Sequence, residues 1–126
     1  MIRILIVEDD ENISKMLAAT LSIGDYEYDR CADGEEAVQT IINGTYDLIL
    51  LDVMLPGVDG IELLQRMKAS AELRTIPVVM ATAKGAEYDK IRGLDLGADY
   101  YLVKPFGVME LVSCVCLLYT SPSPRD

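Results

Sequence analysis

The chain has 126 residues, of which 51% are hydrophobic, so it suits one folded domain with a substantial core and does not resemble a disordered chain. Its formal net charge of −10 argues against nucleic-acid binding by this chain, because phosphate contacts need clustered lysine and arginine. The absence of histidine excludes the usual catalytic triads and histidine-rich zinc sites.

The apolar runs and the N-terminal residues carry no membrane or export signal. No run reaches the roughly 20 apolar residues that span a bilayer. Residues 1–7 lead directly into acidic residues and lack the small-residue cleavage site of a signal peptide. The cysteines, Cys31, Cys114 and Cys116, are odd in number and fit unpaired thiols in a reducing compartment. We therefore expect a soluble intracellular protein with no membrane contact.

Five stretches predict strands. Apolar or alternating runs occur at residues 2–7, 26–31, 47–52, 76–81 and 100–103. The run at 47–52 is apolar almost throughout, which is typical of a strand buried on both faces of a parallel sheet. Because helical patterns separate the strands, we expect an α/β fold with a parallel sheet covered by helices on both faces.

Helical spacing of apolar residues predicts a helix after each strand. The first helix is capped by Asp10 or Asn12 and ends at Gly24. Asp33-Gly34 is interpreted as a turn and cap before a second helix, which carries the stripe from Ala37 to Ile42 and is closed by Asn43-Gly44. Further helices are expected around 61–67, at 85–97 and from about 108. The inward-facing residues of the first two helices are, by this spacing, Ile13, Met16, Leu17, Thr20, Leu21, Ala37, Val38, Ile41 and Ile42.

The last stretch departs from this pattern. Leu117 and Leu118 extend an apolar run without amphipathic order, and two prolines within the last five residues would stop a helix. We therefore expect a domain over residues 1–112 and an atypical tail at 113–126 that is not the native continuation of the last helix. A frameshift or a joined artificial sequence would give such a tail, and a frayed natural C-terminus is the alternative.

Polar side chains stand at the carboxyl ends of four predicted strands. They are Glu8 with Asp9, then Asp52, Thr82 and Lys104. Because parallel strands all point the same way, these ends should meet at one edge of the sheet, where open α/β sheets bind ligands. Clustered carboxylates without histidine or cysteine favour Mg²⁺ or Mn²⁺. An aspartate can accept a phosphoryl group, and the lysine and threonine could then contact its oxygens.

Each of these residues also has an ordinary structural interpretation. The acids at 8–11 could be a solvated helix start, and Asp52 could cap the following loop. Thr82 could be a plain strand-end residue and Lys104 a surface charge. Their joint occurrence at the same ends of four strands favours a functional site.

Four segments resemble the receiver domain of two-component response regulators. They are ILIVEDD at 4–10, DLILLDVMLPG at 47–57, VMATA at 79–83 and KPF at 104–106. The resemblance spans about residues 2–112 and is greatest to receivers of winged-helix transcription factors of the OmpR/PhoB type. It implies a flavodoxin-like, doubly wound, five-stranded parallel sheet in the order 2-1-3-4-5, with helices on both faces.

The resemblance also implies the parts of a phosphorylation site. Asp52 matches the phosphoacceptor, and Lys104 matches the lysine that contacts the phosphoryl group. Asp9 matches the direct Mg²⁺ ligand, Glu8 its acidic neighbour acting mainly through water, and the backbone carbonyl of Met54 a further ligand.

Other residues match the family's switching parts. Thr82 matches the switch hydroxyl, and Tyr101 the aromatic ring that moves inward with it. Pro105 matches a proline whose preceding peptide bond is usually cis, which would aim the neighbouring lysine. Met54 and Lys84 should flank the phosphoryl group and tune its lifetime.

The function implied is a signalling switch of the bacterial cytoplasm. A sensor histidine kinase would phosphorylate Asp52, and the helix 4–strand 5–helix 5 face would change to control an output domain. Such a domain is regulatory and catalyses only its own phosphorylation and dephosphorylation. The resemblance also implies a homodimer through that face, although the family places an arginine near position 114, where this chain has Cys114. The mixed charges on that face are Lys90, Arg92, Asp95, Asp99 and Glu110.

Other classes share parts of the pattern. A haloacid-dehalogenase-type phosphatase needs a second acid two residues after its nucleophile, where this chain has Met54. A flavodoxin-like electron carrier needs a phosphate-accepting loop where residues 8–11 are acidic. A phosphorylation-independent interaction module is the remaining alternative, although such modules usually lose one of the acids that this chain keeps. We expect a receiver truncated from a longer regulator, with a stand-alone receiver as the alternative.

Overall fold

The described elements alternate between strands and helices in a computed structural model that describes residues 2–24, 26–55, 57–83, 85, 97–104 and 106–120. In chain order they are β1 (Ile2–Val7), α1 (Glu11–Ile23), β2 (Tyr26–Cys31), α2 (Gly34–Asn43), β3 (Leu48–Asp52), α3 (Gly60–Ala69), β4 (Val78–Ala83), β5 (Tyr100–Lys104) and α5 (Val108–Thr120). The helix predicted at 85–97 falls on residues 86–96, which lie outside the described residues.

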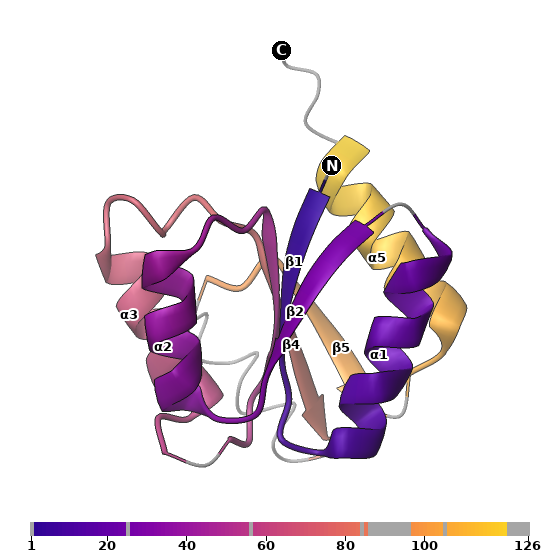
Figure 1. The fold of residues 1–126 in the computed structure, drawn as a ribbon, viewed down its shortest axis with the longest axis horizontal. Helices are drawn as coiled ribbons and strands as arrows, with labels where there is room; N and C mark the ends of the chain where they lie inside the picture. The colour runs from indigo at the N-terminus through magenta and orange to yellow at the C-terminus, as the bar shows by residue number, and fades with distance from the viewer. Residues whose placement is uncertain are drawn as a thin grey trace.

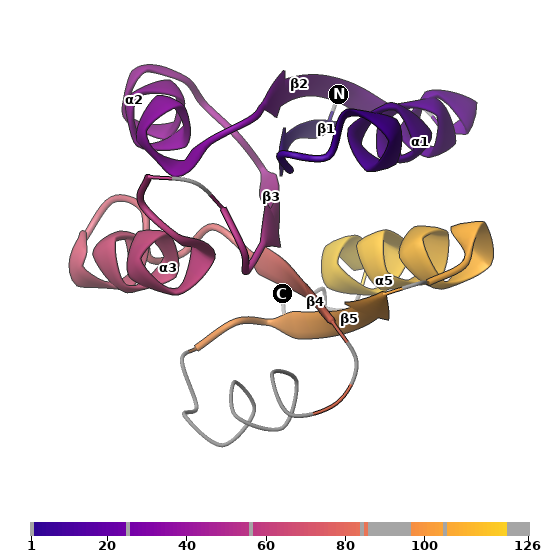
Figure 2. The same cartoon turned by 90° about the horizontal axis from the view of Figure 1, so that it is seen from below.

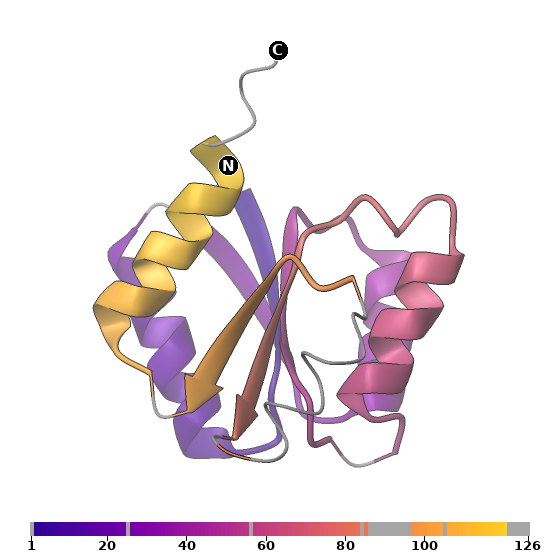
Figure 3. The same ribbon diagram turned by 180° about the vertical axis from the view of Figure 1, so that it is seen from behind.

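The strands form one parallel sheet in the order β2-β1-β3-β4-β5. Helices α1 and α5 cover one face, and α2 and α3 cover the other (Figures 1 and 2). The carboxyl ends of the strands all lie at the edge opposite the start of β1 (Figures 1 and 3). The predicted fold class and strand order are therefore confirmed.

Strand β4 is shifted by two residues from its predicted range of 76–81. Its start at Val78 is fixed because the Val78 N–H donates to Asp99 Oδ2 at 2.9 Å, while the Asp99 N–H donates to the Val78 carbonyl at 2.8 Å. Its end extends to Ala83 because Ala83 pairs with Lys104 of β5. Pairing on both edges therefore sets the bounds, which an apolar run cannot do alone.

Aspartate side chains set the starts of the three helices that follow β1, β2 and β3. Asp10 caps α1, since its Oδ1 accepts from the N–H of Asn12 at 2.9 Å and of Ile13 at 3.2 Å. Asp33 and Asp59 cap α2 and α3 in the same way, each accepting one backbone N–H at 2.8 Å. The cap left open between Asp10 and Asn12 is therefore Asp10.

Two core layers lie on opposite faces of the sheet because successive residues of each strand point to opposite sides. Leu5 and Leu51 belong to the layer under α2 and α3, whereas Ile4 and Leu50 belong to the layer under α1 and α5. All four are buried, which explains why β1 and β3 are apolar without alternation.

Two residues predicted to face inward do not. Met16 of α1 and Ile42 of α2 are 43% and 61% exposed. Each is adjacent to a buried residue, Leu17 and Ile41 respectively, and a step of one residue turns a helical side chain by about 100°. The predicted apolar stripes were therefore one residue too wide.

Helix α5 begins at Val108, as predicted, and continues through Thr120. Leu111, Cys114 and Val115 are buried at helical spacing and pack in the layer shared with α1. The helix thus crosses residue 113, and the foreign origin of residues 113–126 stays a prediction that sequencing the gene at its source would test. Among the described residues, no helix is long and apolar enough to cross a bilayer.

Candidate functional site

The site lies at the carboxyl edge of the sheet, where β1, β3 and β5 end. The Glu8 N–H continues the β1–β2 pairing by donating to the Cys31 carbonyl at 3.0 Å, and the Val53 N–H extends β3 by donating to Ala81 at 3.0 Å. The first residue after β1 and the first residue after β3 are therefore each held by a backbone hydrogen bond to the neighbouring strand. The predicted convergence of separated sequence segments is present at this edge.

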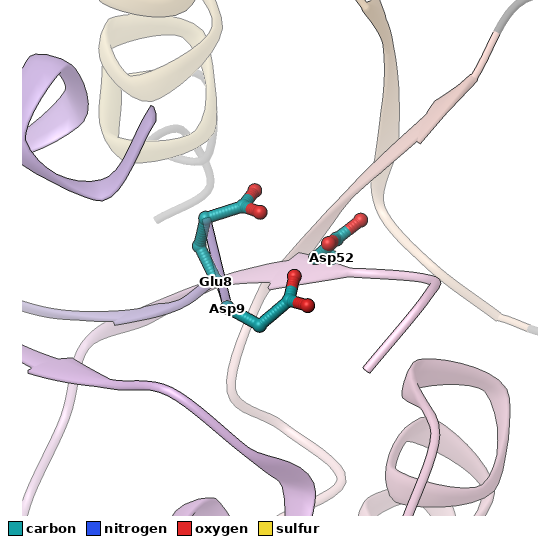
Figure 4. A group of neighbouring side chains, drawn as sticks. All are labelled: Glu8, Asp9 and Asp52. Atoms are coloured by element: carbon teal, nitrogen blue, oxygen red, sulfur yellow. The ribbon is translucent and has the colours of Figure 1, made fainter. Parts of the chain in front are cut away.

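Three carboxylates share this edge. Glu8, Asp9 and Asp52 each offer an oxygen, and these oxygens all lie within 4.8 Å of one another (Figure 4). Glu8 and Asp52 are buried, whereas Asp9 is exposed. The exposed member leaves the cluster open to solvent on one side.

Lys104 bridges the two buried carboxylates. Its Nζ lies 3.1 Å from Glu8 Oε1 and 3.1 Å from Asp52 Oδ1. Backbone donors complete the set, because the Met54 N–H reaches Asp52 Oδ1 at 3.4 Å and the Asp10 N–H reaches Glu8 Oε2 at 3.2 Å. The Lys104 ammonium thus contacts two of the three carboxylates.

Burial governs the protonation of this cluster. Burial, followed by the charge of Asp52, raises the pKa of Glu8 to about 7, with Lys104 opposing the rise. Burial also raises the pKa of Asp52 despite the opposing effect of Lys104. For Lys104, burial would lower the pKa, but the charges of Asp52 and Glu8 outweigh it and raise it. At neutral pH the cluster is therefore short of positive charge and favours either a proton or a cation.

The donor set fits a hard divalent cation. Its ligand atoms are carboxylate oxygens, and no histidine or cysteine belongs to the group. Mg²⁺ prefers such donors, is commonly bound by one or two carboxylates, and retains waters or phosphate oxygens in its other positions. The residues present therefore match Mg²⁺ or Mn²⁺, and binding should displace the proton that burial favours.

The other predicted residues lie on β4, on β5 and directly after β3. Thr82 is buried in β4, directly after Ala81, which pairs with Asp52. Tyr101 is half-buried in β5 and packs against the core layer under α2 and α3. Met54 is 64% exposed beside Asp52.

Some predicted residues cannot be placed. Lys84, predicted to tune the lifetime, and Pro105, predicted to follow a cis bond, lie outside the described residues. The same holds for Lys90, Arg92 and Asp95 of the expected output face. Of that face, Asp99 holds the start of β4 and Glu110 is exposed on α5.

Two glycines of the site were missed by sequence reasoning. Gly34 was assigned only to a turn and cap, and Gly60 received no role. Both open a helix and both pack against the backbone of the loop that follows Asp52. The signal that could have found them is a repeated Asp-Gly pair, at 33–34 and 59–60, ahead of two consecutive helices.

Comparison with known proteins gives consistent matches along the chain. The family model described as the response regulator receiver domain matches residues 4–115. Response regulator ArlR of Staphylococcus saprophyticus is 42% identical over 113 residues, covering 90% of this chain and 50% of the relative. Transcriptional regulatory protein DltR of Streptococcus agalactiae is 44% identical over 115 residues, covering 91% of this chain and 50% of the relative.

A solved structure matches the whole fold. The signal receiver domain of a signal transduction histidine kinase from Syntrophus aciditrophicus superimposes with a TM-score of 0.90 at 33% identity, covering 100% of this chain and 96% of that one. The chain spans about half the length of the curated relatives it matches.

Proposed function

Because this chain belongs to the response regulator receiver domain family, we propose that it is a signalling switch activated by phosphorylation of Asp52. The family assignment supports a regulatory role. In this proposal the domain catalyses only its own phosphorylation and dephosphorylation.

The proposed reaction is attack by an Asp52 carboxylate oxygen on the phosphorus of a phosphohistidine in a sensor kinase. The P–N bond of the donor breaks, the imidazole nitrogen keeps the bonding electrons, and Asp52 becomes an aspartyl phosphate. A small donor such as acetyl phosphate would react in the same way, with its P–O bond to acetate breaking. Burial of Asp52 limits competing water near the nucleophile.

Residues around Asp52 take complementary roles in this reaction. Lys104, whose Nζ lies 3.1 Å from Asp52 Oδ1, transfers its contact to an oxygen of the incoming phosphoryl group. Thr82 donates its hydroxyl to another oxygen of that group. The lysine and threonine thus replace solvent as donors to the transferred group.

The acidic residues would hold the cation. Asp9 binds directly, Glu8 acts mainly through water, and Asp52 and the Met54 carbonyl complete the protein ligands. When bound, Mg²⁺ or Mn²⁺ neutralises charge on the transferred phosphoryl group. The raised pKa of Glu8 supports this assignment, because its causes, burial first and then the charge of Asp52, are both relieved when a cation binds.

The proposed output is a movement of Thr82 towards the phosphoryl group, with Tyr101 filling the vacated space. This local event would bias a two-state face formed by β5, α5 and the helix that the sequence predicts at 85–97. The names of the relatives, a response regulator and a transcriptional regulatory protein, support control of transcription through an output domain or partner in the bacterial cytoplasm. Homodimerisation through the same face is part of this proposal.

One observation carries the proposal: Lys104 bridges the buried Glu8 and Asp52 carboxylates at 3.1 Å each, beside the exposed Asp9. A solvated helix start would need neither the burial nor the bridging lysine. A cluster of this kind is suited to binding a cation and a phosphoryl group together.

The test is phosphorylation of the chain with acetyl phosphate and Mg²⁺, read by intact mass spectrometry. We expect one added phosphoryl group, its loss in Asp52→Asn, and no reaction in the presence of EDTA. The matched control is Asp59→Asn, because Asp59 is exposed in the same loop region and asparagine preserves its capping of α3. Phosphorylation of Asp52→Asn at the rate of the unchanged protein would refute the proposal. Absence of reaction in a folded protein would favour the phosphorylation-independent interaction module.

The lifetime of the aspartyl phosphate should depend on Met54. Its side chain is exposed beside Asp52 and cannot orient a hydrolytic water by hydrogen bonding. We expect Met54→Asn to shorten the half-life of the phosphorylated form, measured by its decay after removal of the donor. Met109→Asn on α5, another exposed methionine, is the control, and equal decay rates for both variants would contradict the assignment.

A further inference from the structure

Helix α3 makes its first contact directly on the backbone of the nucleophile. A Cβ atom on Gly60, the first residue of α3, would overlap the carbonyl oxygen of Asp52 and lie 2.8 Å from Val53 Cα. The Gly60 N–H donates to the Val53 carbonyl at 2.9 Å, which fixes this approach. The obstacles are backbone atoms, so a side chain at position 60 could be accommodated only by moving the end of β3 or the start of α3.

Helix α2 makes an equivalent contact on the far end of the same loop. A Cβ atom on Gly34, the first residue of α2, would overlap the carbonyl oxygen of Val58 and lie 2.6 Å from its carbonyl carbon. Val58 is buried, so the loop cannot move outward there without exposing an apolar side chain. Each end of the loop between β3 and α3 is therefore in contact with the first residue of a helix, and that residue is a glycine in both cases.

The segment between these contacts carries groups of the site. Val53, Leu55 and Val58 are buried, whereas Met54 is exposed. The Met54 N–H reaches Asp52 Oδ1 at 3.4 Å, so a shift of the loop would displace a backbone N–H that donates to the nucleophile. The same shift would move the Met54 carbonyl, which the proposed function assigns to the cation.

We propose that Gly34 and Gly60 are positioning residues of the phosphorylation site, because their missing side chains let α2 and α3 pack directly on the backbone of Asp52, Val53 and Val58. This inference rests on the proposed function, since it assigns the glycines to the geometry of the same cation and phosphoryl site. Displacements of about 1 Å at a reacting centre are enough to slow a reaction substantially. Supporting residues of metal sites commonly change affinity by about 10-fold to 100-fold when altered.

The test compares Gly60→Ala and Gly34→Ala with Gly107→Ala. Gly107 precedes α5, and a Cβ there would meet no atom within 4 Å, so it controls for the general effect of replacing a glycine before a helix. Mn²⁺ binding is measured by equilibrium dialysis at low temperature, after far-UV circular dichroism shows that each variant is folded. We expect roughly 10-fold weaker Mn²⁺ binding in Gly60→Ala and a smaller loss in Gly34→Ala, with no change in the control.

A second readout separates positioning from stability. The rate constant for phosphorylation by acetyl phosphate should fall for Gly60→Ala under conditions in which urea unfolding shows that the variant is fully folded. Unchanged Mn²⁺ binding and an unchanged phosphorylation rate constant in folded Gly60→Ala and Gly34→Ala would overturn the inference. Failure of both variants to fold would also overturn it, by assigning the contacts to stability alone. Absence of Mn²⁺ binding and phosphorylation in the unchanged protein would instead refute the proposed function.

Discussion

Replacing Glu8 with glutamine should stabilise the metal-free protein at neutral pH while weakening the cation site. Glu8 is buried beside Asp52, and Lys104 is shared between the two carboxylates. Burial and the charge of Asp52 raise the pKa of Glu8 to about 7. Glutamine keeps the size and polarity of the side chain but removes the charge that this environment disfavours.

The size and sign of the effect follow from the pKa. The folded protein binds the Glu8 proton more tightly than the unfolded chain, so the stability from this site is complete below pH 4.5 and is lost as pH rises to about 7. At about 1.4 kcal/mol per pH unit, the rise from 4.5 to about 7 corresponds to about 3 kcal/mol. As the pH rises through this range, the free energy of unfolding of Glu8→Gln should therefore increase relative to that of the unchanged protein by up to about 3 kcal/mol.

The assay is urea unfolding followed by far-UV circular dichroism in EDTA, at several pH values from below 4.5 to above 7. The control is Glu35→Gln, which removes a carboxylate that is exposed on α2 and lies outside the three-carboxylate cluster, so it should not reproduce the gain expected for Glu8→Gln. Adding Mg²⁺ at neutral pH should stabilise the unchanged protein more than Glu8→Gln, since the cation replaces the proton. A free-energy difference between Glu8→Gln and the unchanged protein that does not vary with pH would refute this reasoning.

Three further predictions concern other parts of the fold. Lys104→Met should lower metal-free stability at neutral pH by on the order of 2 kcal/mol, because it leaves two buried carboxylates unpaired, and Mg²⁺ should restore part of the loss in urea unfolding. Tyr46→Phe should remove a tyrosine ionisation near pH 12 from the ultraviolet absorbance titration, since burial and the hydrogen bond to Asp29 raise the pKa of Tyr46 to about 12. The raised pKa should contribute stability that is complete below pH 10 and is lost as the pH rises from 10 to about 12. Leu111→Ala, in the buried face of α5, should cost roughly 2–5 kcal/mol in urea unfolding, against less than about 0.5 kcal/mol for Leu117→Ala on its exposed face, and equal losses would contradict the packing of α5.

Parallel topology explains why the centre of the site could be predicted from the sequence. Glu8, Asp52 and Lys104 each end an apolar run, and alternation with helices makes these runs parallel, so their ends must share an edge. The order of the strands does not follow from those patterns. It came from the resemblance, and the backbone pairing confirms it.

The sequence predictions were wrong where contact with a second element determines which residues are buried or where a strand begins. Met16 and Ile42 fit an apolar stripe but lie one residue beyond the surface that the sheet can cover. The start of β4 depends on a hydrogen bond between Val78 and Asp99, which are 21 residues apart. Sequence periodicity describes one element at a time, so it cannot supply information that resides in a contact between two elements.

The glycine contacts and the buried charges point to a common design of the site. Burying Glu8 and Asp52 with one lysine makes the charged, metal-free cluster unfavourable, so the two carboxylates would move apart if their backbone could relax. Gly60 holds the backbone at Asp52 against that relaxation, because α3 packs on it without an intervening side chain. A rigid backbone therefore preserves the unfavourable charge arrangement, and the binding of a cation can relieve it. A change that loosens this loop should therefore raise the free energy of unfolding of the metal-free protein at neutral pH while it weakens Mn²⁺ binding, whereas loss of a purely structural contact would lower both the stability and the Mn²⁺ affinity.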